Sequence, residues 1–348
     1  MEDVVIEVKN LKKWFPVRTS LIKSLIFKER IFVKAVDGIN FSVKKGEIFG
    51  LVGESGSGKT TTGRVIARLI DPTDGKVLFK GKDIWGLSDK ELKKFRRKVQ
   101  IIFQDPYESL NPRMTVYDII AEPLKLLNVT KGEEETKERV NEILESVDLT
   151  PPEEFVYRYP HELSGGQRQR VATARAFVAN PEFVIADEPV SMLDVSIRAG
   201  ILDLMIRLVE KYQTSYLYIT HDLALARHMC DRIAVMYLGK IFEMGTTEQI
   251  VYEPLHPYTK ALIDAVPVPD PTRRRRDIVI KGEIPSPINP PSGCRFHTRC
   301  PSYIGDICRT KEPPLVEVGN GHYVACHLYS GNCFVKILHK CWLMIIFQ

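Results

Sequence analysis

A glycine-rich octapeptide, GESGSGKT at residues 53–60, contains the residue types that bind nucleotide phosphates. It matches the pattern G-x-x-x-x-G-K-[ST] in full, between a predicted strand and a predicted helix. Glycines at these positions let successive backbone N–H groups face the phosphates, the lysine reaches the β- and γ-phosphates, and the threonine hydroxyl binds Mg²⁺. The pattern predicts a nucleotide site made by Gly53, Glu54, Ser55, Gly56, Ser57, Gly58, Lys59, Thr60 and Thr61.

A second stretch, FVIADEP at residues 183–189, supplies paired carboxylates directly after an apolar strand. Open α/β sheets bind ligands at the carboxyl ends of their strands, which is where Asp187 lies. We expect Asp187 to hold Mg²⁺ and Glu188 to polarise the attacking water. By itself such a pair is more often a solvated turn, but the phosphate loop favours the catalytic interpretation.

The third stretch, HELSGGQRQR at residues 161–170, resembles an anion site that lacks its cation. Ser164, Gly165 and Gly166 would begin a helix, and the free N–H groups and dipole of a helix N-terminus favour phosphate. No lysine follows at the position that a phosphate loop requires. An ordinary loop before a helix is the alternative for this stretch taken alone.

The amino-acid sequence around these motifs predicts an α/β fold with a mostly parallel sheet. Strand patterns cover residues 4–52 and return over 183–244, whereas the region from about 105 to 180 is helical. The 348 residues carry a net charge of only +5, which gives little reason to expect nucleic acid as a partner. The N-terminus has no apolar signal region, and no run of about 18 apolar residues indicates a membrane span.

The order of the motifs resembles the ATP-binding cassette family over residues 4–252. In that comparison Gln104 in IIFQDP resembles the Q-loop, Ser191 and Asp194 in SMLD the D-loop, and His221 in ITHD the switch histidine. Phe15 stands where the family stacks an aromatic ring on adenine, with Trp14 as the alternative. The resemblance implies a mostly parallel sheet core, an antiparallel β subdomain and an α-helical subdomain at about 105–180.

The resemblance also implies how the residues divide the work on ATP. Glu188, His221 and Gln104 would be catalytic, and Thr60, Gln104 and Asp187 would hold Mg²⁺. Two cassettes would pack head to tail, so that the signature sequence of one binds the γ-phosphate of the ATP on the other. This gives the lysine-free stretch a role, carried by Leu163, Ser164, Gly165, Gly166 and Gln167.

After residue 252 the composition shifts to proline-rich text that predicts a linker over 253–276 and a small domain over 277–329, followed by a tail of unknown role over 330–348. The small domain has little apolar sequence for a core, and a metal could supply the missing stability. Its spacing lacks the C-x₂-C pairs of a zinc ribbon and suits an iron–sulfur cluster as well as zinc. The predicted ligands are Cys294, Cys300, Cys308 and Cys326.

The stretches HPYTKALIDAVP, GCRFHTRCP and VACH resemble the C-terminal extension of oligopeptide and dipeptide importer ATPases. In that group the four cysteines are associated with a [4Fe–4S] cluster, which the resemblance favours over zinc. Disulfides or free thiols are the alternative for these cysteines.

The resemblance implies an ATP-hydrolysing subunit that energises peptide import from the cytoplasmic side of the cell membrane. Its partners would be two transmembrane permease subunits, a second ABC ATPase that is either related or identical, and indirectly an extracytoplasmic binding protein. Oligosaccharides or nickel are alternative cargoes. A soluble cassette protein acting on nucleic acid or ribosomes is a further alternative, but the coiled-coil insertion, internal zinc modules or second cassette usual in that class are missing from the sequence.

Overall fold

The computed structural model describes residues 3–17, 31–265 and 282–330. Within these residues the strands form two sheets. The smaller sheet is antiparallel, in the order β2 (Phe32–Lys44), β1 (Val4–Pro16), β4 (Asp74–Phe79) and β5 (Lys82–Asp83). The larger sheet has the order β11 (Val316–Gly319), β12 (His322–Val324), β10 (Lys240–Thr246), β9 (Arg232–Tyr237), β3 (Ile48–Val52), β8 (Ser215–Thr220), β7 (Phe183–Asp187) and β6 (Val99–Ile102).

The middle of the larger sheet is parallel, as the apolar strand text predicts. Strands β9, β3, β8, β7 and β6 run in one direction, and every residue of β3, β7 and β8 is buried. Parallel strands are buried on both faces, so they read as continuous apolar runs rather than as an alternation. The phosphate loop leaves the carboxyl end of β3, and Asp187 is the last residue of β7.

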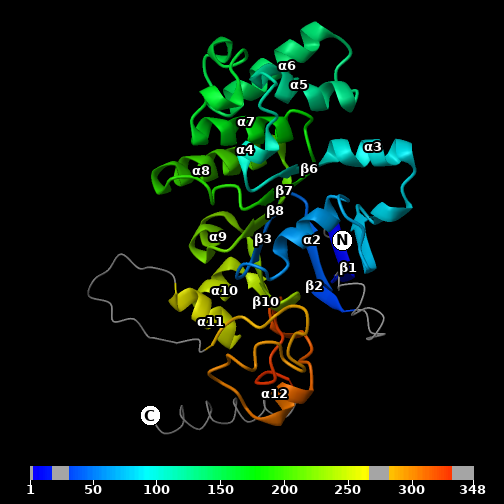
Figure 1. Ribbon diagram of the computed structural model, residues 1–348, viewed down its shortest axis with the longest axis vertical. Helices are drawn as coiled ribbons and strands as arrows, with labels where there is room; N and C mark the ends of the chain where they lie inside the picture. Colours follow the sequence, from blue (N-terminus) through cyan, green and yellow to red (C-terminus); the bar gives the residue numbers. More distant parts are fainter. Residues whose placement is uncertain (1–2, 18–30, 266–281, 331–348) are drawn as a thin grey trace, which may run out of the picture.

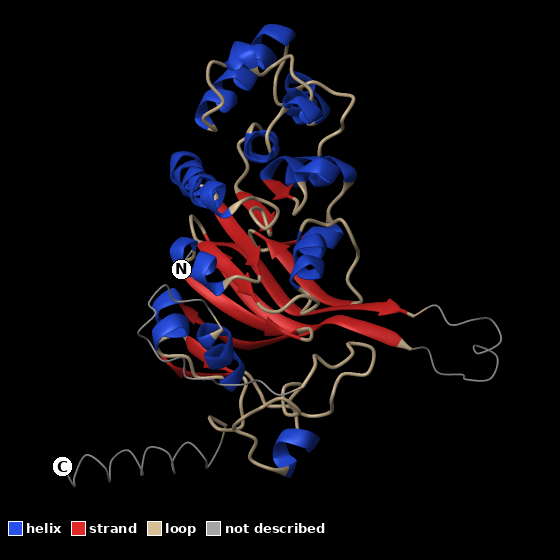
Figure 2. Cartoon of the chain, turned by 60° about the vertical axis from the view of Figure 1, so that its left-hand side comes forward, coloured by secondary structure: helices blue, strands red, loops and turns tan. Residues whose placement is uncertain are grey.

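Helices cover this sheet and extend from one end of it (Figures 1 and 2). An α-helical region within residues 105–180 stands above the sheet in Figure 1 and contains α4 (Pro106–Ser109), α5 (Val116–Leu126), α6 (Glu133–Ser146) and α7 (Gly165–Phe177), with 3₁₀ turns η2 (Pro152–Glu154) and η3 (Pro160–Glu162). The other helices are α2 (Lys59–Ile66), α3 (Asp89–Lys98), α8 (Val195–Tyr212), α9 (Leu223–Met229) and α10 (Thr247–Tyr252), with the 3₁₀ turn η1 (Ile84–Gly86).

The segment after residue 252 differs from its expected organisation. The stretch predicted to be a linker contains helix α11 (Pro257–Asp264), and Tyr258 and Thr259 on this helix are fully buried. His256 caps the helix by accepting a hydrogen bond from the Tyr258 N–H at 3.0 Å. The polar residues and nearby prolines of this stretch gave no helical pattern in the sequence. The helix is stabilised instead by burial against the cassette. Residues 266–281, including the arginine run, lie outside the described residues.

The cysteine-bearing segment joins the cassette instead of forming a separate sheet. Its strand β12 pairs with β10, so β11 and β12 extend the larger sheet. The remainder is loop with the short helix α12 (Asp306–Thr310), and it occupies the end of the molecule opposite the α-helical region (Figures 1 and 2). The predicted tail over 330–348 lies outside the described residues except for Ser330. Among the helices described here, none is both long and apolar enough to cross a bilayer.

Candidate nucleotide-binding site

The phosphate loop turns between β3 and α2 at positions where only glycine fits. A Cβ atom on Gly53 would lie 2.1 Å from the carbonyl oxygen of Met236. Gly58 has φ +105°, and a Cβ atom there would lie 2.1 Å from the carbonyl oxygen of Ala35. Both distances are too short for a real Cβ atom, so the close approach of β9 and β2 requires glycine at these two positions of the loop. The spacing of the motif therefore follows from the packing beneath it.

Lys59 lies under the loop with no carboxylate in direct contact. Its Nζ donates to the carbonyl oxygens of Gly53 at 2.7 Å and Glu54 at 2.9 Å, and lies 3.4 Å from Ser57 Oγ. The residue is only 4% exposed. Burial lowers the pKa of Lys59, although nearby carboxylates oppose this shift. A buried cation held only by neutral oxygens is suited to accept an anionic ligand.

A hydrogen bond joins the phosphate loop to strand β7. The Thr60 hydroxyl donates to Asp187 Oδ1 at 3.0 Å. Burial raises the pKa of Asp187, against the effect of this hydrogen bond. A bound divalent cation would relieve the cost of keeping this carboxylate ionised, because it supplies the missing positive charge. A hydroxyl and a carboxylate oxygen are also the donor types that Mg²⁺ prefers.

Three of the residues predicted to be catalytic meet at one carboxylate oxygen. Glu188 Oε2 accepts a hydrogen bond from Gln104 Nε2 at 3.1 Å and lies 3.0 Å from His221 Nδ1. These residues follow the carboxyl ends of β6, β7 and β8, which are neighbours in the sheet. Glu188 has φ +47°, an uncommon backbone conformation for a residue with a side chain. The strained turn places its carboxylate beyond Asp187 and toward its two partners.

The predicted D-loop is tied to the same turn. The Ser191 hydroxyl donates to the Glu188 carbonyl at 3.0 Å, and Asp194 is the residue before α8. Arg198 on α8 donates to the carbonyl oxygen of Leu193 at 2.9 Å. The sequence analysis did not identify Arg198, which contacts a carbonyl before the start of α8 and belongs to no motif.

The aromatic residue expected to stack on adenine lies at the edge of the small sheet. Phe15 is 37% exposed and pairs in register with Val33 of β2, two residues from the Ala35 carbonyl that contacts the phosphate loop. Trp14, the alternative, donates through Nε1 to Asp37 at 2.9 Å. Of the two rings, Phe15 is the more exposed, with the Lys13 ammonium 5.0 Å from its centre.

The signature sequence forms the first turn of α7. Ser164 Oγ accepts from the Gln167 N–H at 3.2 Å, and Gln167 Oε1 accepts from the Ser164 N–H at 2.9 Å. This reciprocal pair is a capping box. Leu163 is buried and Ser164 is exposed, while a Cβ atom on Gly166 would lie 2.9 Å from Ile197 on α8. Helix α7 packs on α4, α5, α6 and α8, whereas α2 packs on β2, β7 and β8.

Two residues to which the sequence analysis gave no role contact the phosphate loop from the far end of the chain, although they lie in the stretches HPYTKALIDAVP and GCRFHTRCP. The Tyr258 hydroxyl accepts from the Glu54 N–H at 3.0 Å. Arg299 donates to both carboxylate oxygens of Glu54, at 3.0 and 3.4 Å. Arg299 is separated from Glu54 by 245 residues, and local pattern carries no information about so distant a contact.

The four predicted cysteine ligands lie in one part of the C-terminal segment. All four are free, with Cys294, Cys308 and Cys326 buried and Cys300 half-buried. Burial raises the pKa of Cys326 to about 11, and the nearby Cys300 and Cys308 act in the same direction. Within the part of the chain that the structure describes, no three His, Cys, Asp or Glu side chains gather closely enough to hold a metal ion.

Comparisons with known proteins identify the family. The model of a family described as "ABC transporter" matches residues 36–191, and that of "Oligopeptide/dipeptide transporter, C-terminal region" matches residues 242–308. The chain is 50% identical to the oligopeptide transport ATP-binding protein AppF of Bacillus subtilis over 335 residues, covering 94% of this chain and 98% of that protein. It is 52% identical to the putative oligopeptide transport ATP-binding protein YkfD of the same organism, covering 86% of this chain and 91% of YkfD.

Solved structures share the fold. The ATP-binding cassette MJ0796, in a dimeric post-hydrolysis state bound to ADP and Pi, superposes with a TM-score of 0.60 at 31% identity, covering 70% of this chain and 98% of that one. The protein cbiO1 of Clostridium perfringens, part of the ABC transporter complex cbiONQ, gives a TM-score of 0.60 at 27% identity, covering 73% of this chain and 93% of that one. The chain belongs to the ABC transporter family and is a cassette ATPase of the oligopeptide/dipeptide type.

Proposed function

We propose that the chain binds and hydrolyses ATP to energise the import of peptides across the cell membrane. The observation that carries the catalytic part is the meeting of Gln104 and His221 at one oxygen of Glu188, next to the Thr60–Asp187 pair. Similarity to oligopeptide transport ATP-binding proteins over almost the whole chain supports peptides as the cargo. Oligosaccharide or nickel import is the alternative that we leave to transport assays.

In the proposed reaction each group has a separate task. Lys59 and the N–H groups of the phosphate loop hold the β- and γ-phosphates, and Phe15 stacks on the adenine. Thr60, Asp187 and Gln104 would hold Mg²⁺, and the ion would supply positive charge beside the phosphates. Glu188 accepts the proton of the attacking water, and His221 contacts the γ-phosphate. Water adds to phosphorus as the bond to ADP breaks, which yields ADP and inorganic phosphate.

We propose that the signature residues act on the ATP of a second cassette. The exposed Ser164, the glycines after it and the dipole of α7 would bind the γ-phosphate from the opposite side. The dimeric state of MJ0796 in its solved structure supports such a head-to-tail pair. Two permease subunits, a related or identical second ATPase and, indirectly, an extracytoplasmic binding protein would complete the importer, with this chain on the cytoplasmic face.

We further propose that Cys294, Cys300, Cys308 and Cys326 hold a [4Fe–4S] cluster. Four free cysteines in one segment, three of them buried, are the type and number of thiol donors that a [4Fe–4S] cluster uses. A single zinc ion requires all its ligands within about 2.3 Å of one point, and among the described residues no three such side chains gather closely enough for that. Iron, sulfide and zinc analysis of anaerobically purified protein tests this assignment: one zinc per chain without iron would replace the cluster.

The replacement Glu188→Gln tests the catalytic assignment. The variant should bind Mg²⁺–ATP and accumulate as a dimer on size exclusion, while steady-state hydrolysis falls by about 100-fold or more, because the amide cannot accept a proton. Glu182→Gln is a suitable control, since its carboxylate pairs with surface lysines. Unchanged turnover in Glu188→Gln would remove Glu188 from this role.

Reconstitution with permeases tests the importer. The purified chain alone should hydrolyse ATP weakly, and co-expressed permease subunits should raise the rate and support ATP-dependent peptide uptake into vesicles. If the permeases leave hydrolysis unchanged while nucleic acid stimulates it, the transport assignment is wrong.

A further inference from the structure

We propose that Arg299, in the loop between Cys294 and Cys300, positions the phosphate loop for ATP by neutralising and orienting Glu54. This inference rests on the proposed function, because it assigns Arg299 a part in nucleotide binding. Glu54 is the second residue of the phosphate-loop motif, so its carboxylate stands beside a site for a strongly anionic ligand. An unpaired carboxylate there would repel the phosphates.

Glu54 is held at three points. Its carboxylate accepts from Arg299, its N–H donates to the Tyr258 hydroxyl, and its carbonyl accepts from Lys59. The Glu54 carbonyl and the Lys59 ammonium belong to the same hydrogen-bonded unit as the Arg299 pair. A shift of Glu54 would therefore displace the lysine that the γ-phosphate requires.

The environment makes the Arg299–Glu54 pair stronger than a surface ion pair. The Arg299 side chain is 9% exposed and the Glu54 side chain 23%. Arg299 also donates to the Tyr237 hydroxyl at 3.2 Å, and its guanidinium lies 5.7 Å from the centre of that ring. A bidentate guanidinium–carboxylate pair with this burial has a fixed geometry, which suits a positioning role.

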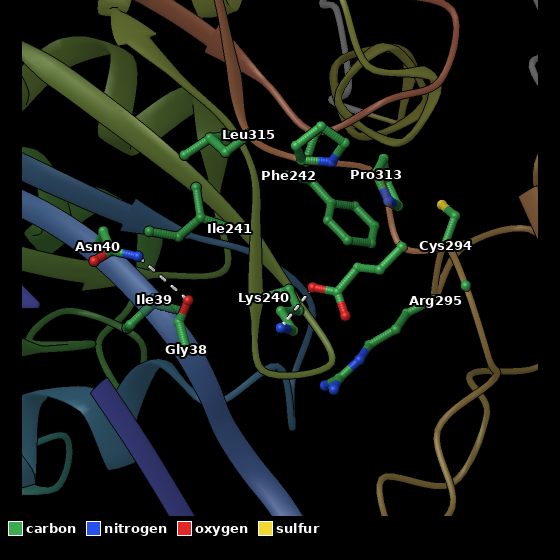
Figure 3. A pocket seen from close by; sticks show the side chains of 14 residues that line it. Gly38, Ile39, Asn40, Lys240, Ile241, Phe242, Cys294, Arg295, Pro313 and Leu315 are labelled. Atoms are coloured by element: carbon green, nitrogen blue, oxygen red, sulfur yellow. Dashed lines mark hydrogen bonds and ion pairs between the residues drawn. The ribbon is translucent and has the colours of Figure 1, made fainter. Parts of the chain in front are cut away.

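The loop that carries Arg299 is fastened to the cassette at two further residues. Phe296 is fully buried, with its ring edge on Tyr237 and its centre 5.3 Å from that of Tyr258. Arg295 pairs with Asp37 and donates to the Leu238 carbonyl. In Figure 3 the Arg295 side chain points toward β2.

This arrangement connects the cysteine loop to both ends of the nucleotide site. Arg299 reaches the phosphate loop through Glu54, and Arg295 reaches Asp37, which accepts from Trp14 next to the proposed adenine residue Phe15. The loop between Cys294 and Cys300 thus contacts the cassette on both sides of the nucleotide site. The contact that bears most directly on phosphate binding is the one between Arg299 and Glu54.

The experiment measures the Kd of Mg²⁺–ATP on the full chain by calorimetry, with Glu188→Gln in every protein to prevent turnover. Arg299→Ala should raise Kd about tenfold or more, because a charge-assisted pair is lost and a carboxylate is left beside the phosphates. Arg299→Lys should give a smaller increase, since one donor remains. Adding Glu54→Gln to Arg299→Ala should restore much of the affinity, because the unpaired charge is removed.

Arg309→Ala is the matched control. Arg309 lies in the same cysteine-bearing segment and pairs with Asp306 on the surface at 2.9 Å, so its loss should leave Kd unchanged. Iron and zinc content is measured on each variant, so that a change in Kd is compared at equal metal content. If Arg299→Ala does not fold, Arg299→Lys and Glu54→Gln carry the test.

The outcomes separate this inference from the proposed function. If the parent protein does not bind Mg²⁺–ATP, the proposed function fails. If the parent binds ATP and Arg299→Ala binds it equally well, only the role of Arg299 fails. If Glu54→Gln restores nothing in the double variant, Arg299 does not act through Glu54 and the proposal is overturned. A merely structural pair would change the unfolding temperature without changing Kd.

Discussion

Helices α2 and α7 each begin at or directly after a glycine, next to a proposed phosphate site, but their first turns are satisfied in opposite ways. Helix α2 follows Gly58, which offers no side chain to cap it, and the loop before it is shaped by the carbonyls of Met236 and Ala35. Helix α7 follows Ser164, which forms a capping box with Gln167. One helix end depends on tertiary packing, whereas the other is satisfied by its own sequence.

The two helix ends therefore differ in what each can bind without a partner chain. The phosphate loop holds a buried lysine on neutral oxygens, so a site for an anion exists within one chain. The signature turn has an exposed serine and no lysine in its motif, and its polar groups already have local partners. We therefore expect changes at α2 to remove nucleotide binding in the single chain, and changes at α7 to affect hydrolysis only through the dimer.

Lys59→Ala should produce the largest effect. It removes the one cation of the phosphate loop, so we expect Mg²⁺–ATP binding to weaken by about 100-fold or more, as for loss of several charge-assisted hydrogen bonds. Equilibrium titration with a fluorescent ATP analogue measures this. Lys45→Ala, at an exposed turn before β3, is the control. If Lys59→Ala bound Mg²⁺–ATP as tightly as the parent, the phosphate site at α2 would not depend on its lysine.

Ser164→Ala should have an intermediate effect that depends on the dimer. Nucleotide affinity of the monomer should stay unchanged, whereas hydrolysis should fall because the trans contact to the γ-phosphate is lost. The same change removes an N-cap and should lower the free energy of unfolding by about 1 kcal/mol. Urea denaturation and steady-state hydrolysis measure the two consequences.

Ser164→Gly separates these two consequences. Glycine is nearly as good an N-cap residue as threonine, so the free energy of unfolding should fall by only about 0.3 kcal/mol. Hydrolysis should nevertheless fall as in Ser164→Ala, because the hydroxyl is missing. If hydrolysis by Ser164→Gly equals that of the parent, the serine serves only to cap α7.

Gln167→Ala should have the smallest effect. It deletes the reciprocal half of the capping box and leaves the Ser164 hydroxyl in place, so we expect a loss of about 0.5 kcal/mol in unfolding free energy. Hydrolysis should change less than in Ser164→Ala. A larger loss of hydrolysis in Gln167→Ala would indicate that the glutamine, and not the serine, contacts the γ-phosphate of the second cassette.

Features that depend on short stretches of chain could be predicted from the amino-acid sequence. The phosphate-loop spacing, the apolar text of β3 and β7, and the order of the motifs predicted the family, because these patterns reflect local backbone geometry and burial on both faces of a parallel sheet. The cap at Ser164 is local too, since serine and glutamine three residues apart favour it.

Contacts between segments that are distant in the sequence became visible in the folded chain alone. The tertiary structure placed β12 beside β10, formed α11 where a linker was expected, and brought Arg299 onto Glu54. It also gave Glu188 a left-handed backbone and one oxygen shared by Gln104 and His221. Each of these features is stabilised by contacts between residues far apart in the chain, whose energies leave no periodic signal in the sequence.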